Sequence, residues 1–296
     1  MDYGQLIKAV VSEVQKQHLR QPKIDESICL RWIDGYLDSF DPRHLYFLDS
    51  DIIEFRTFVE KLPELASSGK PDLYRLVTER YQERAESALT RAIDRLNGSF
   101  DFSTDEEIPL RRKTWPISID DRDERWRLQL KYELLIEKSN DSTIDNAKSF
   151  LRSRYESIRK QAGEITDEQA VGFYLDSFCR TIDPDSGYFT KTEFNLFDGG
   201  PLREYSIGLH AVNSNGRSII QRFGPGFRRE SEASSILGCE LLAIRDQSGV
   251  EHHVPEIHWS TLSRLIMFGM HADDGVTLEL YDEVRLRRFS VKWPRK

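Results

Sequence analysis

REYSIGLHAVN, residues Arg203 to Asn213, places one glycine, Gly208, between the branched apolar residues Ile207 and Leu209. Glycine weakens a strand unless another backbone must approach closely or an unusual dihedral angle is needed. A short loop whose successive N–H groups point at an anion is one structure with such a need. The stretch therefore raises the hypothesis of an anion-binding loop that leads directly into a β-strand.

The composition is sufficient for substantial hydrophobic cores. Of the 296 residues, 39% are hydrophobic and 11% are aromatic, which allows two domains or one large one. The net charge of −8 argues against a general nucleic-acid-binding protein, because phosphate binding relies on a basic surface. No apolar run approaches the roughly 18 residues that span a bilayer. We expect neither a nucleic-acid partner nor a membrane span.

The pattern of apolar residues changes near residue 199. Before it, apolar residues recur at helical spacing, as in 72–96, and Thr166 with Gln169 forms a capping box at a helix start. After it, short segments such as SIIQRF, CELLAIRD and VTLELYD alternate with turns, and one helix-like stretch begins at Trp259. The sequence predicts an α+β protein, with an all-helical domain over residues 1–199 and a small β-rich domain over residues 200–296.

Two segments of the helical region resemble each other. YLDSFDPRHLYFLDSDIIEF (36–55) and YLDSFCRTIDPDSGYFTKTEFNLF (174–197) each run from a helix into an Asp-Pro turn. The acids and His44 are candidates for catalysis, but an aspartate before proline is first a turn former. We interpret Asp41-Pro42 and Asp183-Pro184 as two similar turns that end helices, and we assign no catalytic residue.

Neither cysteines nor histidines indicate a metal centre. Cys29, Cys179 and Cys239 are far apart and lie among apolar residues, which predicts buried free thiols. HHVPEIH, from His252 to His258, contains good zinc ligands, but its proline breaks helical spacing and an extended segment points neighbours to opposite faces. We interpret it as a polar loop and expect no metal and no cofactor.

The order of these motifs resembles a known family. The helical region, FCRTIDPDSGYFTKTEFNLF, SIGL, FGPG…SSILGCELLAI, the Trp259 helix and DDGVTLEL look like the amino-terminal part of tail-specific proteases, also called carboxy-terminal processing peptidases. The similarity is greatest to the long periplasmic type, in which a helical domain precedes a PDZ module. It covers nearly the whole chain, and its specificity lies in the order and spacing of the motifs.

The resemblance implies a peptide-binding groove. SIGL is similar to the carboxylate-binding loop of a PDZ domain, where converging N–H groups hold the terminal carboxylate of a protein's C-terminal peptide. The peptide then adds as a strand beside GLHAV. The implied peptide-binding residues are those of the loop, the first strand and the facing helix: Ser206, Ile207, Gly208, Leu209, His210, Leu262, Leu265 and Ile266.

The sequence departs from the family pattern at two places. FRRESEAS (227–234) replaces a small-residue stretch expected before SILG, and we expect this difference to alter one edge of the groove. Cys239 stands where an acid is usual in the turn, a difference that we interpret as structural.

The resembled family uses a serine nucleophile with a lysine as general base, in a core that follows the PDZ module. Here RLRRFSVKWPRK follows the last expected strand region, and Lys292 and Lys296 are the only late lysines. We expect this chain by itself to be inactive as a peptidase, either as a fragment of a longer serine endopeptidase or as a degenerate homologue.

Two functions remain open at this point. The first is a non-catalytic recognition part that binds C-terminal peptide tails, with the helical domain contacting an adaptor protein or a second copy of the chain. The alternative is a structural or oligomerisation scaffold whose PDZ-like groove is closed. The resemblance implies a periplasmic location if a leader has been removed. Otherwise the N-terminal sequence, which has no signal-peptide pattern, predicts a cytoplasmic location.

Overall fold

The computed structural model describes residues 2–19, 23–108, 112–139, 143–184, 186–191, 209–214, 217–223, 233–245, 251–254, 276–282, 284–285 and 287–293. In this part of the chain the helices are α1 (Tyr3–Gln17), α2 (Glu26–Phe40), α3 (Asp49–Arg56), α4 (Leu62–Ser68), α5 (Asp72–Arg95), α6 (Ile119–Ser139), α7 (Ile144–Gly163), α8 (Asp167–Ile182) and the short 3₁₀ helix η2 (Ala233–Ile236). The strands are β1 (Leu209–Ser214), β2 (Arg217–Phe223), β3 (Glu240–Arg245), β4 (Glu251–His253), β5 (Val276–Asp282) and β6 (Arg287–Trp293).

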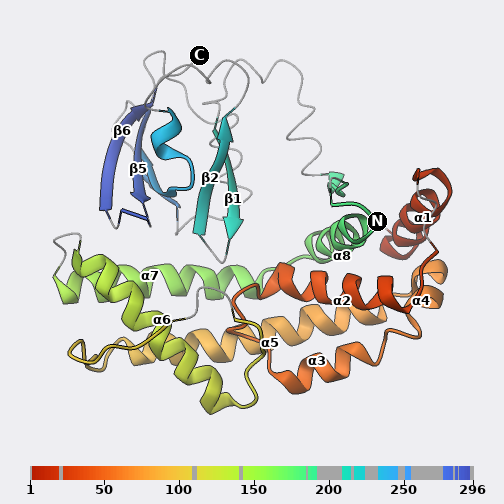
Figure 1. Cartoon of the computed structure of the whole chain (residues 1–296), viewed down its shortest axis with the longest axis horizontal. Helices are drawn as coiled ribbons and strands as arrows, with labels where there is room; N and C mark the ends of the chain where they lie inside the picture. Colours follow the sequence, from red (N-terminus) through yellow and green to blue (C-terminus); the bar gives the residue numbers. More distant parts are fainter. Residues whose placement is uncertain are drawn as a thin grey trace. The chain divides into compact units, whose positions relative to one another are not determined.

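The predicted fold class is confirmed. All eight described α-helices precede all six described strands, and every strand pair is antiparallel (Figure 1). The sheet order is β1-β2-β3-β5-β6, and β4 pairs with β3 outside this path. The chain is therefore an α+β protein with a helical region followed by a small β-rich region.

The chain packs as two compact units, and neither is one continuous segment. Unit 1 consists of Met1–Arg95, Glu106–Leu128 and Ala162–Glu193, and unit 2 of Leu96–Asp105, Gln129–Gln161 and Phe194–Lys296. Unit 2 thus combines the strands with the second part of α6 and most of α7. The domain limits 1–199 and 200–296, which follow the change in sequence pattern, stay a prediction.

Helices α2 and α8 pack together in the centre of unit 1. The Trp32 indole donates a hydrogen bond of 2.8 Å to the Tyr174 carbonyl oxygen, and the Ser177 hydroxyl donates one of 2.9 Å to the Trp32 carbonyl oxygen. The Trp32 ring also lies 4.5 Å from the Phe178 ring, measured between centroids. A Cβ atom on Gly35 meets the Ser177 hydroxyl oxygen at 2.8 Å, so a glycine permits this close approach.

Each of these two helices ends at an Asp-Pro turn, as interpreted from the sequence. Asp41 and Asp183 are the C-caps, and their carbonyl oxygens accept hydrogen bonds from the backbone N–H groups of His44 and Ser186 respectively. The Asp41 carboxylate is fully buried and accepts three further hydrogen bonds from the N–H groups of residues 45–47. The buried carboxylate therefore fixes the path of the backbone after α2.

A second buried carboxylate joins α3 to α5. The Asp51 side chain, 1% exposed, accepts hydrogen bonds from the guanidinium groups of Arg80 and Arg84 and from the N–H of Leu48, the N-cap of α3. Burial opposes ionisation of Asp51, but the hydrogen bonds from Arg84, Leu48 and Arg80 outweigh it and lower its pKa. The ionised form therefore stabilises unit 1.

We expect Asp51→Asn to lower the free energy of unfolding by about 3 kcal/mol at pH 7, because it leaves two arginines without their partner. The lowered pKa in the folded state means that the carboxylate stabilises the protein above its unfolded pKa of about 4 and ceases to do so as the pH falls through the folded value. The deficit of the variant therefore shrinks on acidification. Urea titrations at pH 7 and in acid measure it, and Asp49→Asn on the same helix turn is the control. Equal losses in both variants at pH 7 contradict this role.

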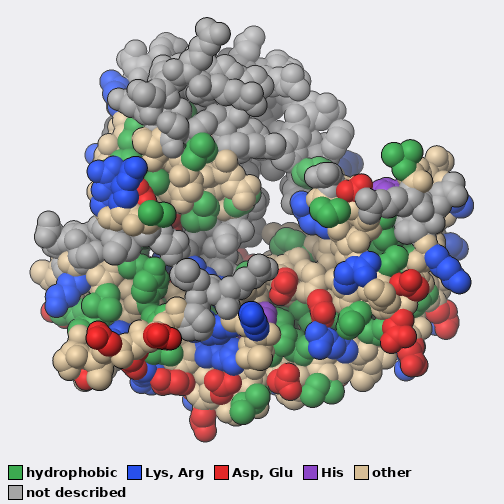
Figure 2. Space-filling model, viewed as in Figure 1, with side chains coloured by type: hydrophobic (Ala, Val, Ile, Leu, Met, Phe, Trp, Pro, Cys, Tyr) green, Lys and Arg blue, Asp and Glu red, His purple; other side chains and the backbone are tan. Residues whose placement is uncertain are grey.

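The surface carries charges of both signs. Lysine, arginine and carboxylate side chains are interspersed over the face seen in Figure 2. The described helices include none with the length and apolar character that a membrane crossing requires.

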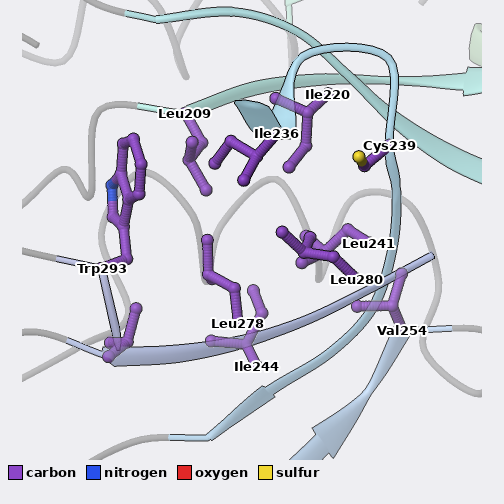
Figure 3. Close-up of a cluster of buried hydrophobic side chains, with 11 residues drawn as sticks. Leu209, Ile220, Ile236, Cys239, Leu241, Ile244, Val254, Leu278, Leu280 and Trp293 are labelled. Carbon is purple, nitrogen blue, oxygen red and sulfur yellow. The ribbon is translucent and has the colours of Figure 1, made fainter. Parts of the chain in front are cut away.

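The β-sheet has two different buried faces. Leu278 and Leu280 of β5 lie in a large core cluster with Trp293 of β6 (Figure 3). Val276 of β5 belongs to the same cluster, whereas Tyr281 belongs to a separate small cluster. Successive side chains of a strand point to opposite faces, so both faces of this sheet are covered.

A register shift in β3 keeps this arrangement consistent. The pairing of β3 with β5 is irregular between Leu241 and Ala243. Such a shift inserts one residue and reverses the alternation of side chains. As a result Leu241 and Ile244 both enter the large cluster, while Leu242 enters the small one.

The three cysteines are buried free thiols, as predicted. Burial is the main reason that the pKa of each of Cys29, Cys179 and Cys239 is raised to about 11. Their thiolates, which are the reactive form, are therefore scarce at neutral pH.

We expect a thiol reagent at pH 8 to modify these three cysteines roughly 100-fold more slowly in the native protein than in urea, because both access and thiolate are restored by unfolding. Absorbance of the released chromophore measures the rate. A cysteine introduced at the exposed position Gln221 of β2 is the control and reacts rapidly in the native state. Rapid native modification of Cys29, Cys179 or Cys239 contradicts the expectation.

Candidate peptide-binding site

The structure describes part of the predicted peptide-binding site. Ser206, Ile207, Gly208, Leu262, Leu265 and Ile266 lie outside the described residues. Leu209 and His210 are the first two residues of β1, and for His210 the backbone alone is described. The site can therefore be built from β1 and from what holds it.

Leu209 is an anchor of β1. Its side chain is 3% exposed and lies in the large core cluster with Ile220, Ile236 and Trp293 (Figure 3). Its backbone is paired with Phe223 at the end of β2. Whether Leu209 also lines a pocket for a peptide side chain stays a prediction. Its burial fixes the point at which the chain from Ser206 enters the sheet.

Strand β1 stands at one end of the strand order. It pairs with β2 from Leu209 to Ser214, with an irregularity between His210 and Ala211. In the described sheet no strand pairs with the other side of β1. An edge strand presents a row of backbone donors and acceptors to which an extended peptide can add. The position of β1 thus suits strand addition.

The histidine-rich segment is only partly described. Its first residues belong to β4, and the residues after Val254 lie outside the described part. Among the described residues, no group of three or more His, Cys, Asp or Glu is placed to hold a metal ion.

A group of buried charges in unit 2 was not predicted from the sequence. A small cavity between α6, α7 and the sheet is lined by apolar and charged residues, including Glu133, Glu137, Arg154 and Glu240. Their sequence signal is faint: charged residues interrupt the apolar stripes of KYELLIEK and FLRSRYES, as they also do on solvent-exposed helices. Only the three-dimensional arrangement distinguishes them.

The fold defines a class of two-part proteins, in which a helical region precedes a small antiparallel sheet, and β1, at one end of the described strand order, begins directly after the glycine-containing sequence SIG. The comparison with protein families identifies which one. The model of the tail specific protease N-terminal domain matches residues 10–192, and the chain belongs to this family.

A relative gives the scale of the match. The tail-specific protease of Haemophilus influenzae is 25% identical to this chain over 250 residues, which cover 82% of the chain and 35% of the relative. The chain therefore spans about a third of the length of this curated relative. The family match itself ends before β1.

We expect Leu209→Ala to lower the free energy of unfolding by about 3 kcal/mol, because it removes a buried side chain from the large core cluster. Urea unfolding followed by fluorescence of the tryptophans measures the change. Leu237→Ala, at a position 43% exposed, is the matched control and leaves stability almost unchanged. An unchanged stability of Leu209→Ala contradicts the anchoring role.

Proposed function

We propose that this chain is the substrate-recognition part of a tail-specific protease, and that it binds the C-terminal tails of proteins. The tail adds as an extra strand beside β1, and the loop from Ser206 to Leu209 holds its terminal carboxylate. The observation that carries the proposal is the position of β1, which lies at the edge of the described sheet and begins at Leu209, the last residue of SIGL. Family membership supports a protease-related role.

The chemistry of such a site follows from the terminal carboxylate of the peptide that it binds. A carboxylate is recognised best by several N–H donors that converge from one side, and hydrogen bonds to a charged group are the stronger kind. Gly208 permits the tight backbone path that brings the donors together. Leu262, Leu265 and Ile266, on the expected facing helix, supply apolar contacts to the last side chain of the tail.

We assign no catalytic residue to this chain. The proposal is that peptide-bond hydrolysis belongs to the part of the family's longer members that this chain does not span, such as the remainder of the Haemophilus influenzae relative. Recognition and cleavage are then separate tasks, and the task of the present residues is to select and present a tail.

We expect a fluorescent peptide with an apolar last residue and a free carboxylate to bind roughly 10- to 100-fold more tightly than its amidated copy, because amidation removes charge-assisted hydrogen bonds. Fluorescence anisotropy measures both affinities. Gly208→Val is expected to abolish the difference by blocking the loop. Gly163→Val, at a position where an added Cβ meets nothing within 4 Å, is the control.

The outcomes separate the two functions. Equal binding of the free and amidated peptides refutes carboxylate capture. Failure to bind either peptide favours the alternative, a structural or oligomerisation scaffold with a closed groove.

A further inference from the structure

The second face of the sheet packs on helices. Its buried apolar residues are Leu242 of β3 and Tyr281 of β5, which form a small cluster with Ile136 of α6. Tyr132 and Phe150, from α6 and α7, are half-buried against this cluster. We call this region of unit 2 the sheet–helix contact, and residues 129–161 the helix pair.

Two ion pairs cross the sheet–helix contact. Glu137 of α6 accepts a hydrogen bond of 2.6 Å from Arg288 of β6, and the Arg154 guanidinium of α7 lies 3.3 Å from the Glu240 carboxylate of β3. The side chains of Glu137, Arg154 and Glu240 are at most 9% exposed, and that of Arg288 is 37% exposed. The Arg288 guanidinium also lies over the Phe150 ring, 4.6 Å from its centroid. Charge thus accounts for much of this contact.

The two faces of the sheet are stabilised by different interactions, apolar packing on the first and ion pairs with a small apolar cluster on the second. Among the residues that the structure describes, the large core cluster on the first face contains 11 buried residues, whereas the small cluster contains three. Hydrophobic stabilisation scales with buried apolar area, so the first face is held far more strongly. Buried ion pairs add little net stability, since desolvation offsets their attraction, but they fix which groups meet. Small polar contacts of this kind resemble interfaces between separable bodies.

We propose that the sheet–helix contact is a docking face. The sheet, together with its large core cluster, binds to the helix pair at this face and separates from it while remaining folded. The pairs Glu137–Arg288 and Arg154–Glu240 define the one position in which it docks. This inference does not depend on peptide binding.

Five charged groups govern the docked state. Glu137 faces Arg288 from β6, Arg154 from α7 and Glu240 from β3, and Glu133 lies one turn earlier on its own helix. The three carboxylates among them carry one more charge than the two arginines, so the group has a net charge of −1 when all five are ionised. Burial raises the pKa of Glu137 although both arginines oppose the shift, and Glu240 adds to it. The docked state therefore holds more protons than the separated state, so acid favours docking.

The test measures a distance within the full chain. Spin labels on cysteines introduced at the exposed positions Ser153 of α7 and Gln221 of β2 report the separation of helix pair and sheet by pulsed electron paramagnetic resonance. Hydrogen exchange of the β5 amides reports whether the sheet remains folded. At pH 8 we expect one narrow distance distribution and protected amides.

Removal of one charge is expected to undock an intact sheet. Arg288→Met leaves Glu137 buried without its main partner, so the distribution broadens while the β5 amides stay protected. Glu137→Leu combined with Arg288→Met replaces the pair by apolar groups and restores the narrow distribution. Arg287→Met, the control, changes the neighbouring residue, which contacts the Phe289 ring on the first face, and leaves the distribution narrow.

Lowering the pH tests the role of the Glu137 charge independently of the substitutions. Lowering the pH from 8 to 5 is expected to narrow the distribution of Arg288→Met, because Glu137 accepts a proton on docking. A broad distribution at pH 5 contradicts the assigned role of Glu137.

The other results are equally decisive. A broad distribution in the unmodified sequence background, or a narrow one in Arg288→Met at pH 8, overturns the proposal. Loss of β5 protection in Arg288→Met overturns it as well, since the contact is then part of a single cooperative core. A distance distribution that stays broad in the double variant, or one that is broad in Arg287→Met, refutes the role of the Glu137–Arg288 ion pair.

Discussion

The alternation of side chains along β3, β5 and β6 constrains the whole of unit 2. Because Leu278 and Tyr281 of β5 point to opposite faces, and both are buried, the sheet is covered on two sides in unit 2. One side is closed by the large core cluster around η2 and Trp293. The other is closed by parts of α6 and α7. The grouping of helical residues 129–161 with the strands, far away in sequence, follows from this second cover.

Unit 1 relies on a different device, the buried carboxylate. Asp41 holds the backbone after α2 through three N–H groups, and Asp51 ties the start of α3 to α5 through two arginines. Buried charges are tolerated where every partner is supplied, and such networks make a structure specific more than they make it stable. Unit 1 is thus fitted to hold a fixed shape.

Local order in the sequence was enough for most elements. The capping box of Thr166 and Gln169 starts α8 as predicted, and the Asp-Pro turns end α2 and α8. CELLAIRD and VTLELYD contain the strands β3 and β5, and SIIQRF covers all of β2 except its first residue, Arg217. These features are decided by residues within a few positions of one another, which is the range over which periodicity and turn chemistry act.

The sheet–helix contact could not be predicted in this way. Glu137 and Arg288 are 151 residues apart, and nothing in their own neighbourhoods distinguishes them from solvent-facing charges. The same limit applies to Leu209. Its sequence context indicated the start of a strand, but its place beside Trp293 depends on how β6 returns to the sheet. For the candidate site, the SIGL loop was predicted from the family resemblance, whereas the anchoring role of Leu209 became visible only from the packing of the sheet.

The composition of unit 2 from three separate segments has a consequence for synthesis on the ribosome. A chain emerges from its N-terminus, so the helix pair is made before Leu242 of β3 and Tyr281 of β5, which pack against Ile136. Unit 1 ends at Glu193 and can complete its packing first. Until translation passes Tyr281, the nascent protein exposes the apolar side chain of Ile136 beside charged groups that are buried in the folded chain.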